Sequence, residues 1–219
     1  MKKRSLLLIT IFLVAFITLV GCGKKEDNVE SKTDYLVLVN KYSQLPDNWE
    51  STVELASAKD FEGGDIQVEK KALDEFYKLQ DALHKEGIDI VLDSVYRSVS
   101  KQQKLWDDWS ADPEKGIEYV RKYVAVPGYS EHHTGLAIDI AIKKDGRIIY
   151  DNDEMIAERE IFAKVHEKLA DYGFILRYLE GREDSTGYTY EPWHFRYVGI
   201  DAAKDITSKG LTLEEYLNK

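Results

Sequence analysis

The chain carries two kinds of hydrophobic pattern, one with the three- or four-residue spacing of a helix and one with the two-residue alternation of a strand. The helical spacing predicts a helix over 68–83 that stops at Gly87, one after Ser98, one opened by Asp112-Pro113, one over 162–172 closed by Gly173, and a short one from Thr212 to Leu217. The alternation predicts strands over 35–40, 88–92, 137–142, 174–176 and 193–198, with a hairpin turn at Asp145-Gly146. This order of elements predicts an α+β domain with a small, largely antiparallel sheet and helices packed around it.

The length and composition fit one packed domain. The 219 residues are 43% hydrophobic, which is enough for a single core over 35–219 and does not require a second one. The apolar residues of the helix after Ser98 include Trp106 and Trp109, and the simplest interpretation of both is that they belong to this core. We expect the domain to be a monomer.

The first 22 residues have the pattern of an export signal. Lys2, Lys3 and Arg4 precede an uninterrupted apolar run over 6–20, which at about 1.5 Å per residue is too short for the ~30 Å core of a bilayer. The run ends in Leu19-Val20-Gly21-Cys22, which resembles a bacterial lipobox. An ordinary cleaved signal is the alternative. Because Cys22 is the only cysteine, we favour a lipid on Cys22, a flexible tether over 23–34, and anchoring to the outer face of the cytoplasmic membrane.

The charge of the chain is acidic. Loss of the three positive residues at the start would take the formal net charge from −10 to −13. Nucleic-acid binding needs clustered lysine and arginine to neutralise phosphates, and no stretch carries such a cluster. We therefore expect no nucleic-acid partner.

The candidate chemistry lies in two separated stretches. The first is Ser130-Glu131-His132-His133-Thr134-Gly135-Leu136-Ala137-Ile138-Asp139, and the second is Glu191-Pro192-Trp193-His194. Two imidazoles and one carboxylate brought together from these stretches would supply three ligands to Zn²⁺ and leave a position for water. Neighbouring residues of an extended segment point to opposite sides, so of His132 and His133 only one is expected to face the metal, and we assign it to His132. His84 and His166 lie on predicted helices, and we interpret both as residues that do not bind the metal.

The two stretches favour a catalytic zinc site over a structural one. A structural site is usually closed by four protein ligands, often cysteines, and the only cysteine belongs to the expected signal. Glu191 could act as the general base toward a zinc-activated water, a group that a structural site does not need.

These motifs resemble the zinc peptidases of the VanY-type D-alanyl-D-alanine carboxypeptidase family, which includes L,D-carboxypeptidases of peptidoglycan. The resemblance rests on Ser130-x-His132-x-x-Gly135-x-Ala137-x-Asp139 and Glu191-x-x-His194, supported by Tyr96-Arg97-Ser98-x-x-x-Gln102, Pro127-Gly128-Tyr129-Ser130 and Gly173-Phe174-Ile175-Leu176-Arg177-Tyr178. It extends over about 35–198.

The resemblance implies a zinc ion held by His132, Asp139 and His194 with Glu191 as base, and a substrate pocket lined by Arg97, Gln102, Ser130 and Tyr178. It also implies removal of a C-terminal D-alanine from peptidoglycan stem peptides. The planar guanidinium of Arg97 could pair with the terminal carboxylate or stabilise the developing oxyanion. The alternatives are a D-Ala-D-Ala dipeptidase, a peptidoglycan endopeptidase, or a cell-wall binding module that keeps the zinc without turnover.

Overall fold

The computed structural model describes residues 33–113 and 116–218, which belong to one compact unit, Ser31–Lys219. The expected signal, Cys22 and nearly all of the tether lie outside the described residues. Within the described part of the chain, every helix is too short or too polar to cross a membrane. The helical elements, including single turns of 3-10 helix marked η, are η1 (Trp49–Ser51), α1 (Lys70–Lys85), α2 (Val99–Ser110), α3 (Ile117–Tyr123), η2 (Glu131–Thr134), α4 (Asn152–Ala157), α5 (Arg159–Leu169), η3 (Ala170–Tyr172), α6 (Glu183–Thr186), α7 (Ile200–Lys209) and α8 (Leu213–Tyr216).

The strands form two antiparallel sheets, as expected for the α+β class. They are β1 (Leu55–Lys59), β2 (Asp65–Glu69), β3 (Asp89–Leu92), β4 (Ala137–Lys144), β5 (Arg147–Ile149), β6 (Phe174–Leu176) and β7 (His194–Tyr197). Strands β1 and β2 pair with each other, while the larger sheet has the order β3-β4-β7-β6 with β5 paired to the far end of β4. The long strand β4 is therefore the centre of the larger sheet, and its start and end have different neighbours.

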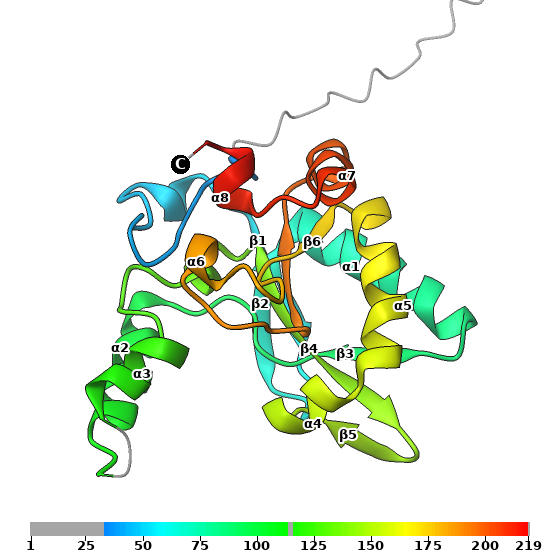
Figure 1. The fold of residues 1–219 in the computed structure, drawn as a ribbon, viewed down its shortest axis with the longest axis horizontal. Coiled ribbons are helices and arrows are strands. Elements are labelled where there is room, and N and C mark those ends of the chain that lie inside the picture. Colours follow the sequence, from blue (N-terminus) through cyan, green and yellow to red (C-terminus); the bar gives the residue numbers. More distant parts are fainter. Residues whose placement is uncertain (1–32, 114–115, 219) are drawn as a thin grey trace, which may run out of the picture. The chain divides into compact units, whose positions relative to one another are not determined.

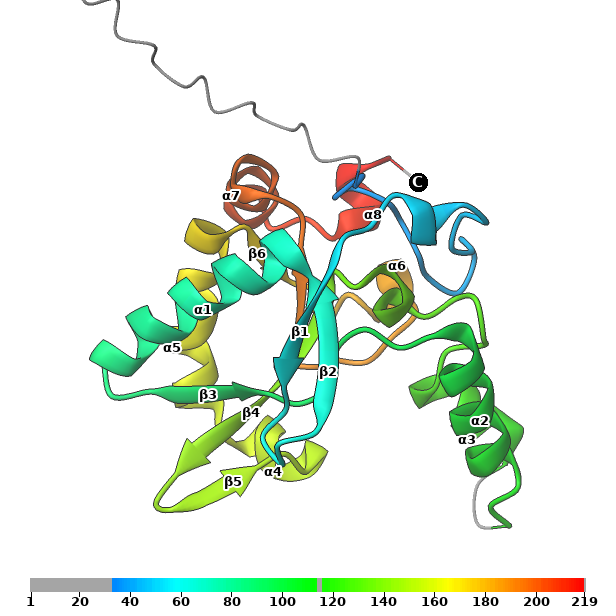
Figure 2. The ribbon, with the colours of Figure 1, turned by 180° about the vertical axis from the view of Figure 1, so that it is seen from behind.

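The main core lies between the larger sheet and two helices. Helices α1 and α5 lie on one side of this sheet, and the pair α2 and α3 lies on the other (Figures 1 and 2). Fully buried side chains from both layers meet in this core, among them Phe76, Phe162, Phe174 and Phe195. A smaller cluster joins Ile175 to Ile206 of α7 and to Leu213 of α8. The C-terminal helix is thus packed into the domain.

Most of the predicted elements are confirmed. The predicted helices over 68–83 and 162–172 correspond to α1 and to α5 with η3, and Asp145-Gly146 forms the turn between β4 and β5. Ser98 accepts a hydrogen bond from the backbone N–H of Lys101 and caps α2. Thr212 caps α8 through a capping box with Glu215.

Two expectations for helices are wrong. Trp106 and Trp109 are only partly buried and lie outside the two hydrophobic clusters, because α2 packs chiefly on α3 at the edge of the domain. The helix expected from Asp112-Pro113 begins instead at Ile117, and its N-cap is Gly116.

The strand expected over 35–40 is also wrong, although the segment is buried at Val37, Leu38 and Val39. Its backbone does not join a sheet within the described residues. Instead, the carbonyl oxygens of Tyr35 and Val37 accept hydrogen bonds of 3.0 and 2.7 Å from Nη2 of Arg196 on β7. A buried guanidinium thus takes the acceptors that a neighbouring strand would otherwise use.

Candidate metal centre and active-site cleft

Three side chains of the candidate site come from elements that meet at one end of the larger sheet. Asp139 on β4 and His194 on β7 are directly opposite each other in the antiparallel register, so they are cross-strand neighbours. His132 lies in the 3-10 turn η2, which ends at Gly135 with a φ of +73°. A Cβ atom at Gly135 would lie 2.7 Å from the Leu55 side chain, so glycine is required both by the backbone angle and by the space.

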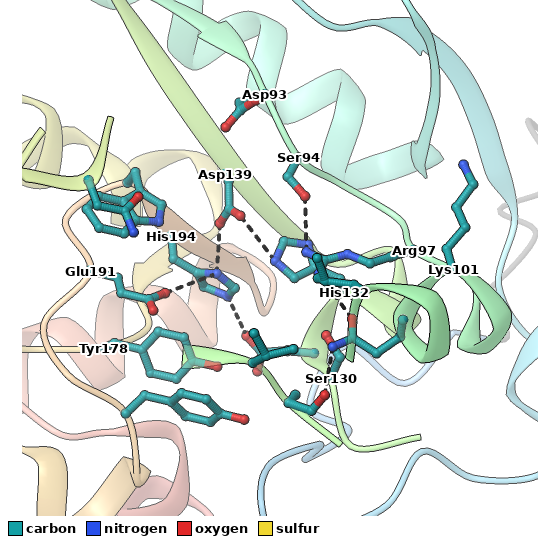
Figure 3. Close-up of a pocket in the computed structure, with 18 of the residues that line it drawn as sticks. Asp93, Ser94, Arg97, Lys101, Ser130, His132, Asp139, Tyr178, Glu191 and His194 are labelled. Atoms are coloured by element: carbon teal, nitrogen blue, oxygen red, sulfur yellow. Dashed lines mark hydrogen bonds and ion pairs between the residues drawn. The ribbon is translucent and has the colours of Figure 1, made fainter. Parts of the chain in front are cut away.

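The three side chains converge on one point (Figure 3). Nε2 of His132 lies 3.2 Å from Oδ2 of Asp139, and Nδ1 of His194 lies 2.8 Å from Oδ1 of Asp139. One ligand atom from each residue falls within 4.8 Å of the other two. All three side chains are at least 86% buried, with exposed fractions of 8%, 14% and 4% for His132, Asp139 and His194.

The outer ring nitrogens of both histidines face acceptors. Nδ1 of His132 donates to the backbone carbonyl of Val95 at 2.9 Å, and Nε2 of His194 donates to a carboxylate oxygen of Glu131 at 3.1 Å. In a neutral imidazole the other nitrogen then carries the lone pair, which in both rings is the nitrogen that faces Asp139. Once both imidazoles are neutral, as metal binding requires, two lone pairs and one carboxylate are directed at the same point, as in a set of metal ligands.

The carboxylate of Asp139 supports the presence of a cation at this point. Its buried Oδ1 has no hydrogen bond of acceptable geometry to any described residue, although His194 Nδ1 is only 2.8 Å away. Burial alone would raise the pKa of Asp139, but the two histidines hold it well below its usual range. Burial would also lower the pKa of His194, which Asp139 and Glu131 instead raise to about 10. The site thus attracts a positive charge, and nitrogen and carboxylate ligands in this ratio fit zinc.

Glu191 lies beside this cluster without being part of it. Its Oε2 is 3.8 Å from Nδ1 of His194. The tight turn that leads into β7 holds it there, because the N–H of His194 donates to the carbonyl of Glu191 at 3.2 Å. Burial, with help from the nearby charges of Asp139 and Glu131, raises the pKa of Glu191 to about 7. A carboxylate with such a pKa can take and return a proton near neutral pH.

The cluster lies in a cleft of about 610 Å³ that also contains the other predicted pocket residues. Arg97 donates from Nη1 to Gln102 Oε1 at 3.0 Å and from Nη2 to Ser94 Oγ at 3.2 Å. Gln102 is buried on α2 and in turn donates to the carbonyl of Ala125 at 2.7 Å. The guanidinium plane is therefore held in place at the wall of the cleft.

Ser130 and Tyr178 complete the predicted set. Ser130 is 5% exposed and immediately precedes η2, and it lines the cleft. The ring of Tyr178 packs between those of His194 and Tyr188, with centroid distances of 4.7 and 4.8 Å. Burial raises the pKa of the Tyr178 hydroxyl well above its usual value, so it remains a neutral donor. The structure thus brings all eight predicted zinc-site and pocket residues into one cleft.

The remaining histidines lie outside the cluster. His133 is buried behind it, where Nδ1 donates to the carbonyl of Arg97 at 2.6 Å and Nε2 accepts from the N–H of Gly128 at 3.1 Å. His166 bonds the carbonyl of Pro192 at 2.9 Å, and His84 pairs with Asp89 at the surface.

A buried ionic network next to the candidate metal ligands was not predicted from the sequence. Glu131 Oε1 accepts hydrogen bonds from Arg177 and Arg196, whose side chains are fully buried, and Arg177 also pairs with Glu214 of α8. One signal was present, since arginines within the apolar segments 174–178 and 195–198 are unusual in a strand that is buried on both faces.

Comparisons with known proteins agree with this geometry. The sequence model described as "VanY: D-alanyl-D-alanine carboxypeptidase" matches residues 65–200. The chain is 38% identical over 183 residues to the bifunctional D-Ala-D-Ala dipeptidase and D-Ala-D-Ala carboxypeptidase VanXYC of Enterococcus gallinarum, and the match covers 83% of this chain and 92% of that protein.

Two experimental structures resemble the fold at comparable identity. The LD-carboxypeptidase LdcB matches with a TM-score of 0.74 and 38% identity, over 87% of this chain and 88% of that one. A mutant of the D,D-pentapeptidase VanY from a VanB-type resistance cassette, in complex with Zn(II), matches with a TM-score of 0.68 and 31% identity, over 84% and 98%.

Proposed function

Because the chain belongs to the VanY family of D-alanyl-D-alanine carboxypeptidases, we propose that it is a zinc carboxypeptidase that removes a C-terminal D-alanine from peptidoglycan stem peptides. The observation that carries the proposal is the convergence of His132, Asp139 and His194 beside Glu191. A cell-wall binding module would need the three ligands but not a partly buried carboxylate beside them with a pKa of about 7.

The proposed roles follow from the positions of the side chains. His132, Asp139 and His194 hold the zinc, whose chemistry in such a site is to acidify a water molecule and to polarise the peptide carbonyl. Glu191 takes the proton of the attacking water at its carboxylate and passes it to the amine of the departing D-alanine.

Arg97 places a fixed positive charge at the wall of the pocket. Its two terminal nitrogens are held by Gln102 and Ser94, so the fork is fixed before the substrate arrives. It binds the negative charge of the substrate, either the terminal carboxylate or the developing oxyanion. Ser130 and the neutral hydroxyl of Tyr178, which also line the cleft, add hydrogen bonds to the substrate.

The names of the relatives define the class of reaction, cleavage next to a D-alanine, rather than one particular bond. Similar proteins carry the names D-Ala-D-Ala carboxypeptidase, LD-carboxypeptidase and D-Ala-D-Ala dipeptidase. The first two reactions each release one D-alanine, from a pentapeptide or a tetrapeptide stem. The dipeptidase remains the alternative within the family.

The site of action is outside the cytoplasm, where peptidoglycan is found. We further propose that the segment 1–22 is a lipoprotein signal and that a lipid on Cys22 anchors the protein to the outer face of the cytoplasmic membrane. The supporting observation is the apolar run that ends at the only cysteine. Residues 23–34 would then be a tether that allows the domain to reach the cell wall.

Mass spectrometry of defined stem peptides tests the reaction. We expect loss of a single D-alanine from a pentapeptide or a tetrapeptide stem, no reaction after chelation, and recovery when zinc is added back. The matched control is Glu180→Gln, an exposed carboxylate that pairs with Arg159 and lies outside the lining of the cleft, which should keep full activity. Inactivity of the zinc-loaded protein on both stems would refute the proposal, and release of intact D-Ala-D-Ala would favour the dipeptidase.

A further inference from the structure

We infer that Glu214, on the C-terminal helix α8, is a positioning residue for the zinc ligand His194, and that it acts through Arg177 and Glu131. This inference rests on the proposed zinc function and adds a residue that is not part of the lining of the cleft. Three consecutive charged contacts lead from the imidazole to α8: His194 to Glu131, Glu131 to Arg177, and Arg177 to Glu214.

The first contact fixes the tautomer of the histidine. Glu131 Oε2 is 3.1 Å from Nε2 of His194, and the Glu131 side chain is only 1% exposed. An ionised carboxylate can only accept a hydrogen bond, so the proton of the neutral imidazole must be on Nε2. This leaves the lone pair on Nδ1, the nitrogen that faces Asp139 at 2.8 Å. A glutamate held in this place therefore presents the correct nitrogen to the metal.

The second contact fixes the glutamate. Its other oxygen, Oε1, accepts from Nε of Arg177 at 2.8 Å and from Nη1 of Arg196 at 2.6 Å. Arg196 is also bound by the carbonyls of Tyr35, Val37 and Tyr197, which limits its movement. Each oxygen of Glu131 thus has its own partners, and the carboxylate is held by one oxygen so that the other points at the histidine.

The third contact balances the charge. Nη1 and Nη2 of Arg177 form a bidentate pair with Glu214 at 2.9 and 2.6 Å, and Asn40 donates to the same carboxylate at 3.0 Å. Two guanidinium groups and two carboxylates are then buried together without net charge. Without Glu214, one buried positive charge would remain unpaired close to a cationic metal.

The consequence of removing Glu214 follows from the geometry of Arg177. Its free Nη1 and Nη2 would turn to the only remaining carboxylate within its contacts, Glu131, and compete with His194 for Oε2. The imidazole would lose its fixed tautomer, and the unpaired guanidinium would repel the metal. Both effects weaken zinc binding, although α8 contributes no residue to the lining of the cleft.

Zinc titration of the full-length protein in detergent, against a chromophoric chelator, tests the inference. Loss of a group that orients a metal-binding histidine weakens metal affinity by about 10–100-fold. We expect a loss in this range for Glu131→Gln and a loss of about tenfold for Glu214→Gln. The double variant should be no weaker than Glu131→Gln alone, because both changes act on the same hydrogen bond.

The matched control is Glu75→Gln on α1. Glu75 is also a buried carboxylate, 4% exposed, with two cationic partners, Lys71 and Lys78, but it has no contact with the network. The substitution Glu75→Gln should lower the melting temperature and leave the zinc affinity unchanged. If Glu214→Gln folds and binds zinc as tightly as the wild type, or if the two losses simply add, the inference is wrong. If the wild type itself binds no zinc, the proposed function fails instead.

A Glu214→Gln variant that unfolds would leave the titration without an answer, so Glu214→Asp provides a second measurement. The shorter side chain of aspartate keeps the charge balance but moves the carboxylate away from the guanidinium of Arg177. Intermediate zinc affinity in a folded protein supports positioning, whereas wild-type affinity in Glu214→Asp together with a lowered melting temperature would show that α8 only stabilises the fold.

Discussion

The change Glu191→Gln separates catalysis from metal binding. The glutamine has the same size but cannot accept a proton, and the position is 3.8 Å from the nearest ligand nitrogen, outside the group of three ligands. General-base catalysis typically contributes about 10²–10⁴-fold to a rate. We therefore expect kcat/KM to fall by this factor, about 3–5 kcal/mol in the barrier, while zinc affinity stays within about threefold of the wild type.

The same substitution should stabilise the metal-free protein at alkaline pH. The pKa of Glu191 rises from the usual 4.5 to about 7 because of burial, so its ionised form is at most about 3 kcal/mol less favourable in the folded state. This cost is absent below pH 4.5, where both states are protonated, and is complete above pH 7. The melting temperature of metal-free Glu191→Gln should therefore exceed that of the wild type at pH 8 and equal it at pH 4.

The pH profile of the wild type gives an independent measure of the base. Only the deprotonated form of Glu191 can accept a proton, so kcat/KM should fall tenfold per pH unit below its pKa. A bound divalent cation favours the carboxylate, and the limb should then lie below pH 7. The residual activity of Glu191→Gln should lack this limb. A variant with wild-type turnover, or one that loses its zinc, would refute the assignment of Glu191 as base.

Three further predictions concern the substrate, the metal and the anchor. Arg97→Lys replaces a bidentate guanidinium by a point charge and should weaken binding of stem peptides by about 10–100-fold with unchanged zinc content. An unchanged KM and kcat would show that the guanidinium does not contact the substrate. Chelation should abolish hydrolysis and lower the melting temperature, and addition of zinc but not of Mg²⁺ should restore both. Activity that persists in the metal-free protein would exclude the proposed chemistry. Cys22→Ala should move the protein from the membrane fraction to the soluble fraction of cells with its hydrolysis in solution intact, and membrane retention of this variant would rule out the lipid anchor.

The elements that could be predicted are those whose signals are local in sequence. Helix α1 shows its apolar spacing and its end at Gly87, and the β4–β5 hairpin shows its Asp-Gly turn. The hairpin of β1 and β2 was missed because its stability depends on a turn in which Asp60 accepts from the N–H groups of Glu62 and Gly64. A side chain in a polar loop gives no periodic signal.

The wrong strand over 35–40 and the missed ionic network have one physical cause. Both depend on Arg196, which is about 160 positions away from the segment whose carbonyls it binds. Apolar alternation indicates that residues such as Val37 and Val39 are buried, but not which donors satisfy the backbone. The candidate zinc ligands could be proposed because the chemistry restricts the residue types, and the pocket residues were proposed from the resemblance to the VanY-type family. The residues that hold them, such as Glu131, are restricted only by the tertiary structure.

A buried ionic network lies behind the candidate metal site, and the cost of burying ions bears on its composition. Burying ions loses hydration, and an apolar replacement of similar volume would often be neutral or stabilising for the fold. An apolar group at Glu131, however, could not accept the Nε2 proton of His194, and a lone glutamate would carry an uncompensated charge in the interior. One arginine, Arg196, neutralises Glu131, and the charge of the second, Arg177, is neutralised by Glu214. The four ions therefore form a neutral set that keeps a carboxylate on the histidine, and Glu214 gives α8 a part in that set.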